Sequence, residues 1–129
     1  MNMADIREKI MDFERQRQTL VTISMQKQQL EQSLHGIDKT VEELERTKEE
    51  KVYKVAGNIL VLRDKKEVKK ELEDNKETQA LRLKTVEKQE KMMVDKLNAL
   101  RAEIEAEAAK SAPNGKDDAT VISSKKKDA

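Results

Sequence analysis

Residues 52–63, with the sequence VYKVAGNILVLR, decide the fold of this chain. A run of β-branched and aliphatic residues lies on each side of Gly57 and Asn58, and such runs favour β-strands. Gly and Asn supply the positive φ angles that a tight two-residue turn requires. The stretch therefore predicts a β-hairpin, which is the most specific local signal in the chain.

One face of this hairpin is apolar. A two-residue turn places Val55 opposite Leu60 and Tyr53 opposite Leu62, on the same face of the strand pair. An isolated two-stranded hairpin is marginal in water and has open edges, so we expect it to pair with equivalent hairpins of other subunits. The residues expected to take part in assembly are Val52, Tyr53, Val55, Gly57, Asn58, Ile59, Leu60, Val61 and Leu62.

The segments on either side of the hairpin have the pattern of long helices. From Leu20 to Leu44 the seam residues are spaced three and four apart, with one polar breach at Lys27. The second segment repeats the pattern from Leu83 to Ile104, with a single breach at Glu90. The expected elements are a helix over about 3–50, the hairpin over 52–63 and a helix over about 65–109.

Two details concern the ends of these helices. Ile10 and Phe13 do not both fit the register that begins at Leu20, so we expect a register shift or a looser end there. Asp64, followed by Glu67 three residues later, has the pattern of a capping box, and we expect it to cap the second helix.

Two helices of nearly equal length joined by a hairpin predict a long antiparallel coiled coil, an all-α dominated fold with a single β-hairpin. Both chain ends then lie at one end of the coiled coil and the hairpin at the other. Lys27 and Glu90 are about equally distant from the turn, so the fold-back brings the two breaches toward each other. A pair that sets the register and a coincidence of two breached seams both remain open.

The composition excludes several classes of protein. Charged residues make up 41% of the chain, against about 25% in ordinary globular domains, so a large packed core is not expected. The 27 Lys and Arg and 26 Asp and Glu leave a net charge of +1 and name no partner. No cysteine is present, which suits a reducing cytoplasm. The longest aliphatic run, Ile59 to Leu62, is far shorter than the roughly 20 residues of a membrane span, and we expect no membrane partner.

No pattern points to catalysis, a metal or a cofactor. The only imidazole, His35, lacks the partners of a metal site or a catalytic dyad, so we expect no enzyme. Three lysines at 125–127 come without a stacking platform, and we expect no nucleic-acid partner. Past Ala109 the composition shifts to small polar residues, which predicts a disordered tail over 110–129.

The open end of the predicted coiled coil carries adaptable apolar side chains. Five of the six methionines lie toward this end, and methionine fits irregular apolar surfaces. The end is therefore suited to hold exposed segments of other chains, unless these residues simply close the coiled coil. The candidate client-binding residues are Ile6, Ile10, Met11, Phe13, Met93, Leu97, Leu100 and Ile104.

The sequence resembles a known family. The stretch VYKVAGNILVLRDKKEVKKELEDNKETQALRLKTVEKQEKMMVDKL at 52–97, with QKQQLEQSL at 26–34, is similar to the β-type subunits of archaeal prefoldin. The resemblance covers roughly residues 5–108. A single hairpin points to the β-type, because α-type subunits carry two hairpins in this connection.

The resemblance implies a hexamer of two α-type and four β-type subunits, whose hairpins form a double β-barrel platform with six coiled-coil tentacles. It also implies capture of unfolded proteins at the tentacle tips without ATP and their delivery to a group II chaperonin. On this chain the barrel strands would lie within Val52 to Arg63. The residues it would place at the client-holding tip are Ile6, Ile10, Phe13, Leu97, Leu100 and Ile104.

The principal alternative is a structural coiled-coil spacer or adaptor, because heptads alone do not distinguish holding a client from setting a distance. The hairpin around Gly57 and Asn58 disfavours a plain spacer.

Overall fold

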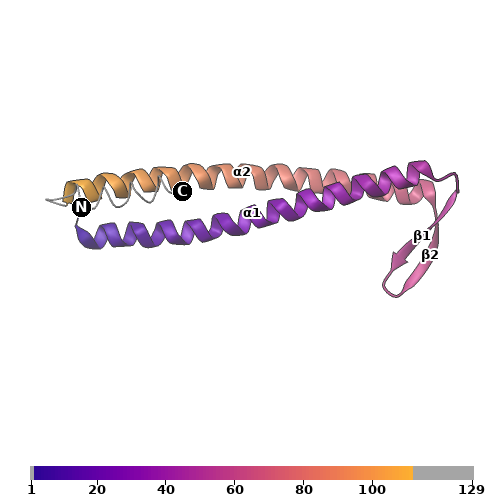
Figure 1. Ribbon diagram of the computed structural model, residues 1–129, viewed down its shortest axis with the longest axis horizontal. Helices are drawn as coiled ribbons and strands as arrows, with labels where there is room; N and C mark the ends of the chain where they lie inside the picture. Colours follow the sequence, from indigo (N-terminus) through magenta and orange to yellow (C-terminus); the bar gives the residue numbers. More distant parts are fainter. Residues whose placement is uncertain (1, 112–129) are drawn as a thin grey trace, which may run out of the picture. The chain divides into compact units, whose positions relative to one another are not determined.

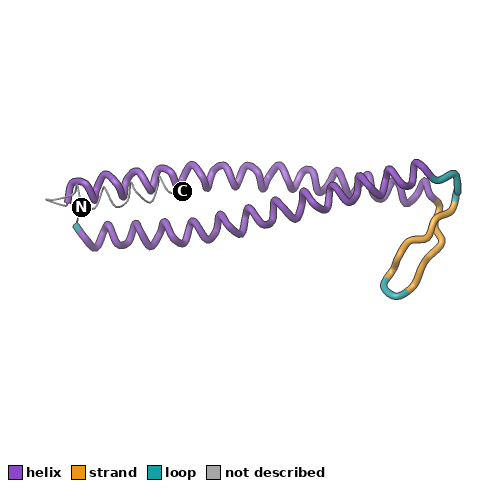
Figure 2. Tube along the Cα trace, in the orientation of Figure 1, coloured by secondary structure: helices purple, strands orange, loops and turns teal. Residues whose placement is uncertain are grey.

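The computed structural model describes residues 2–111 (Figure 1). A two-stranded β-hairpin lies between two long helices, as predicted, and helix dominates the described chain (Figure 2). The elements are α1 (Met3–Arg46), β1 (Lys51–Ala56), β2 (Ile59–Asp64) and α2 (Lys65–Ser111). Residues 112–129 of the predicted tail lie outside the described residues.

A reciprocal cap starts α1. The Asp5 backbone N–H donates to Asn2 Oδ1 over 2.9 Å, and the Asn2 N–H lies 3.4 Å from Asp5 Oδ2. Each side chain thus satisfies a backbone donor that the first helical turn leaves unpaired. The carboxylate of Asp5 also lies where the helix dipole favours negative charge.

The helix α1 ends at Arg46, four residues earlier than expected. Lys65 donates hydrogen bonds to two backbone carbonyls of the segment after α1. Its Nζ lies 3.0 Å from the Thr47 oxygen, and its backbone nitrogen lies 2.8 Å from the Glu50 oxygen. Lys65 thus ties the segment that follows α1 to the start of α2.

Residues 23–89 form one of two compact units, which contains the second part of α1, the hairpin and the first part of α2. Lys69 Nζ lies 3.3 Å from Glu45 Oε1, and Lys76 Nζ lies 2.6 Å from Asp38 Oδ1. The partner moves back along α1 as the lysine moves forward along α2, so the helices of this unit are antiparallel, as predicted. The buried residues of this unit's seam are Ile37 and Leu44.

Residues 2–22 and 90–111 form the other unit, which we call the tip, and its helical segments again lie side by side (Figure 1). Its buried residues are Ile6 of α1 and Leu97 of α2. Together with Ile37 and Leu44 they are the buried apolar residues of the described chain. The interior is therefore a seam between helices, as the high charge content predicted.

The seam of α1 keeps one register through the tip. Inward-facing residues upstream of Leu20 are Lys9, Phe13 and Gln16, at the same spacing of three and four. The expected register shift is therefore wrong, and Ile10 lies outside the seam. Lys9 takes the seam position because its aliphatic stem packs there while its ammonium reaches Glu103 Oε2 at 3.4 Å.

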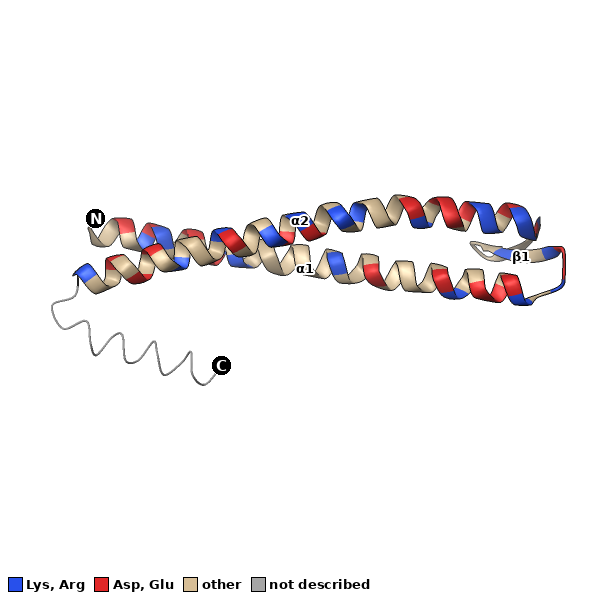
Figure 3. Ribbon diagram, turned by 90° about the horizontal axis from the view of Figure 1, so that it is seen from above, with Lys and Arg blue, Asp and Glu red and all other residues tan. Residues whose placement is uncertain are grey.

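Charges cover the outer surfaces of both helices. Lys and Arg alternate with Asp and Glu along α1 and α2 without a long band of one sign (Figure 3). This pattern agrees with the balanced composition and offers no basic stripe for a nucleic acid among the described residues.

Candidate functional site

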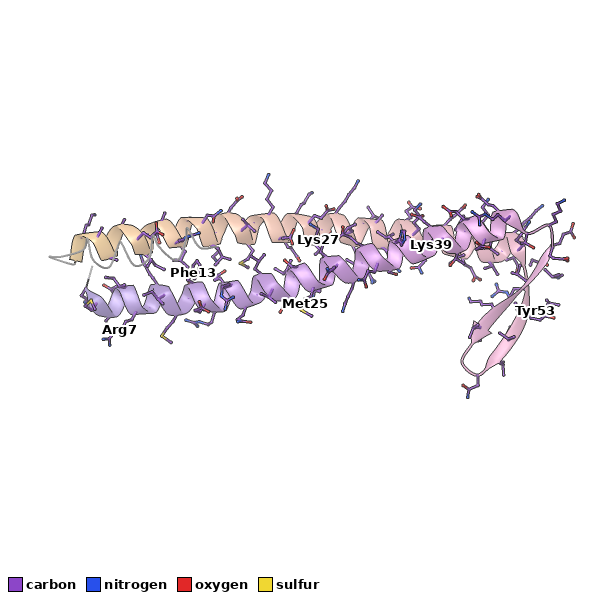
Figure 4. The ribbon with its side chains drawn as sticks, viewed as in Figure 1. Arg7, Phe13, Met25, Lys27, Lys39 and Tyr53 are labelled. Carbon is purple, nitrogen blue, oxygen red and sulfur yellow. The ribbon has the colours of Figure 1, made fainter. Side chains whose placement is uncertain are left out.

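The hairpin forms in the predicted register. Val55 pairs with Leu60 and Tyr53 with Leu62, so these four side chains share one face, which we call the hairpin face. In the single chain all four side chains are between 54% and 70% exposed. Tyr53 is labelled in Figure 4. Ile59 and Val61 are exposed on the opposite face. The hairpin therefore carries exposed apolar side chains on both of its faces.

The turn depends on one glycine. Gly57 has φ +61°, whereas no other residue of the described chain has a positive φ. The expectation that both Gly57 and Asn58 take positive φ is therefore wrong. A type II′ turn needs positive φ only at its first central position, and glycine there matches the twist of the two strands.

Ion pairs fasten the hairpin to α2. Arg63 Nη2 of β2 lies 2.6 Å from Glu71 Oε1, and Lys54 Nζ of β1 lies 3.0 Å from Glu71 Oε2. Glu67, one turn earlier, lies 3.5 Å from Arg63 Nη2. Hydrogen bonds from Arg63 and then Lys54 hold the pKa of Glu71 below its ordinary value. The hydrogen bond to Glu71 correspondingly raises the pKa of Arg63.

A further pair closes the open end of the hairpin. Lys51 and Asp64 are directly opposite in the ladder, with Nζ 2.6 Å from Oδ1. This hydrogen bond lowers the pKa of Asp64 and raises that of Lys51. Asp64 lies immediately before α2, where a cap was expected, but its carboxylate is engaged across the strands instead.

The predicted client-binding residues of the tip divide by exposure. Ile6 and Leu97 are 8% and 7% exposed, so they close the seam between the helices. Ile10 and Met11 are 45% and 62% exposed and lie outside it. The remaining members are half-buried: Phe13, Met93, Leu100 and Ile104.

Met3 is an exposed tip residue that the sequence analysis did not select. It lies seven residues before Ile10, which is about two helical turns, so both side chains are on one face of α1. The spacing of three and four, continued upstream from Leu20, places both Met3 and Ile10 outside the seam. This pattern was the signal in the sequence that Met3 is exposed. We call Met3, Ile10 and Met11 the tip surface.

The described residues hold no group of three or more His, Asp or Glu suited to a metal ion, and His35 is exposed. A groove of about 700 Å³ in the unit 23–89 is lined mainly by amide, hydroxyl and aliphatic groups. Neither α1 nor α2 contains an apolar stretch long enough for a membrane crossing.

Comparisons with known proteins agree with one another. The family model described as "Prefoldin subunit" matches residues 7–111. The prefoldin subunit beta of Pyrobaculum calidifontis is 37% identical over 92 residues, which cover 70% of this chain and 74% of the relative. The prefoldin subunit beta of Saccharolobus islandicus is 34% identical over 112 residues, or 86% and 89% of the two chains.

A solved structure has the same fold. The crystal structure of the prefoldin beta subunit from Thermococcus strain KS-1 matches with a TM-score of 0.73 at 30% identity. The match covers 79% of this chain and 90% of the Thermococcus chain.

Proposed function

The chain belongs to the prefoldin family of chaperone subunits, and we propose that it holds unfolded proteins at its tip and passes them, without ATP, to a group II chaperonin. The family is not one of enzymes, and its subunits assemble with one another. The observation that carries the client-holding proposal is the tip surface, whose exposed apolar side chains the helix seam does not use.

Methionine suits such a surface. Met3 and Met11 flank Ile10 on α1, and flexible thioether side chains adapt to apolar segments of different shape. Contacts from one tip are few, so useful holding requires several tips to act on the same client. The proposal therefore assigns affinity to the assembly and not to one chain.

The hairpin face is the proposed contact with the other subunits. Two hairpin faces packed together bury eight large side chains, each between 54% and 70% exposed in the single chain, which contributes roughly 6–17 kcal/mol, while association itself costs about 4–15 kcal/mol. One hairpin on one hairpin is thus close to balanced. A closed β-barrel is favoured because each hairpin then has a neighbour at both of its edges.

We further propose that the neighbours are other β-type chains and an α-type prefoldin subunit, in a hetero-hexamer located in the cytoplasm. The absence of cysteine suits that compartment. The spacer alternative is not favoured. It would leave the exposed tip surface without a role and would not account for membership of the prefoldin family.

The test is co-expression of the chain with an α-type prefoldin subunit. We expect a hexamer mass by light scattering and suppression of the aggregation of a chemically unfolded test protein, equally with and without ATP. Added group II chaperonin should then raise the yield of refolded protein. A hexamer that leaves aggregation unchanged would contradict client holding and favour the spacer.

A further inference from the structure

The bonds to Glu71 come from both strands of the hairpin. Its Oε2 accepts from Lys54 of β1 over 3.0 Å, and its Oε1 accepts from Arg63 of β2 over 2.6 Å. Both bonds join ionised groups, which makes them stronger than hydrogen bonds between neutral groups. Glu71 therefore joins the two strands to a single point on α2.

The two donors lie on the same side of the sheet. Lys54 is adjacent to Tyr53 in β1, and Arg63 is adjacent to Leu62 in β2, so both donors point away from the hairpin face. Their contact with Glu71 turns their own side of the hairpin toward α2. The hairpin face is consequently directed away from α2.

The hairpin is connected to the two helices in different ways. The strand β2 passes directly into α2 at Lys65, whereas residues 47–50 connect α1 to β1 without helix or strand. A hairpin turned the other way would place Tyr53 and Leu62 against α2, in place of the side that carries Ile59 and Val61. Because both sides of the hairpin carry exposed apolar side chains, the hydrophobic effect alone does not select the observed orientation.

We propose that Glu71 is a positioning residue, which selects the face of the hairpin that is offered to other subunits. This inference rests on the proposed assembly through the hairpin face. The role assigned to Glu71 rests on its contacts with both strands, and exposed ion pairs of this kind contribute little to the stability of a chain. Its loss should change assembly much more than unfolding.

The test compares Glu71→Gln and Glu71→Lys with Glu77→Gln, an exposed carboxylate six residues later on α2. The full chain is titrated with an α-type subunit, and the midpoint concentration of assembly is measured by mass photometry. We expect the midpoint to rise about tenfold for Glu71→Gln and further for Glu71→Lys, with unchanged helix content and unfolding temperature. Glu77→Gln should assemble like the unaltered chain.

Tyr53 gives a second readout because it is the only tyrosine and the chain has no tryptophan. In the dilute unaltered chain, acrylamide should quench its fluorescence as it quenches an exposed tyrosine. In Glu71→Lys we expect weaker quenching, since the hairpin face is free to turn toward the helices. The double variant Lys54→Glu with Glu71→Lys restores one ion pair and should recover both quenching and assembly.

Unchanged assembly and unchanged quenching in Glu71→Lys would overturn the inference. A loss of helix content in Glu71→Gln, not recovered in the double variant, would also overturn it by showing a general structural role. Val55→Asp with Leu60→Asp separates the two proposals. If that variant fails to assemble while the Glu71 variants assemble normally, the hairpin face stands as the interface and only the role of Glu71 is wrong.

Discussion

Val55 lies directly across the strand pair from Leu60, and both side chains are exposed in the single chain. We expect the variant carrying Val55→Asp and Leu60→Asp to remain helical and to form no hexamer with an α-type subunit. Two carboxylates at this cross-strand pair would have to be desolvated in a shared sheet, which is highly unfavourable. Light scattering gives the mass, and circular dichroism gives the helix content.

Leu81→Asp is the matched control for this prediction. Leu81 is 61% exposed, similar to Leu60 at 64%, but it lies on α2 outside the hairpin. It should leave the hexamer intact. A normal hexamer mass for the Val55 and Leu60 variant would show that the hairpin face is not the interface.

The tip surface should determine client holding. Replacing Ile10 and Met11 with serine in every β-type chain should reduce aggregation suppression several-fold, because the apolar area available to a client falls. Helix content and hexamer mass should remain unchanged, since neither side chain belongs to the seam. The measurement is light scattering of a chemically unfolded test protein, with Leu81→Ser as the control. Full protection by the double variant would move the client site elsewhere.

Leu97 should behave differently from the tip surface. It is buried, so Leu97→Ala should lower the free energy of unfolding by about 2–3 kcal/mol through lost packing. We expect urea unfolding to reveal this loss, with little change in client holding at low temperature. If Leu97→Ala left stability unchanged and abolished holding, the division of the tip into seam and surface would be wrong.

The two described glycines predict opposite effects of the same substitution. A Cβ at Gly36 meets no atom within 4 Å, so Gly36→Ala should stabilise α1 by about 0.5–1 kcal/mol. Gly57 also has open space but a φ of +61°, so Gly57→Ala should cost about 1–2 kcal/mol in the hairpin turn. Thermal unfolding tests the first change, and the assembly midpoint tests the second. An unchanged assembly midpoint in Gly57→Ala would contradict the assigned turn.

Acid should loosen the hairpin contacts and weaken assembly. The pKa values of Asp64 and Glu71 are lowered from 3.8 and 4.5, so their bonds favour the observed position of the hairpin above these ordinary values. This contribution declines as pH falls through the ordinary values and is lost below the folded-state pKa. We expect assembly to be constant from pH 7 to about 5 and to weaken below about 4.

The control for the acid prediction is Asp64→Asn with Glu71→Gln, which removes both titrating groups. Its assembly should already be weak at pH 7 and should change less between pH 5 and pH 3. Acrylamide quenching of Tyr53 follows the hairpin over the same range. An identical pH profile in the two proteins would assign the acid effect to other carboxylates.

Local pattern was sufficient to predict much of this fold. The strand register followed from Gly57 and the alternation around it, because a two-residue turn leaves one possible pairing for Val55 and Leu60. The seam from Leu20 to Leu44 followed from the heptad repeat. Both features depend on neighbours in sequence, so the sequence alone determined them.

Tertiary structure decided which apolar residues remain available. Ile6 and Ile10 are both apolar residues at helical spacing, and the structure shows that Ile6 is buried while Lys9 continues the seam in place of Ile10. Likewise, Glu71 has the sequence context of any carboxylate on a charged helix. Its contacts with Lys54 and Arg63 exist because the hairpin folds back beside α2, and the distances that decide such contacts are set by packing between elements.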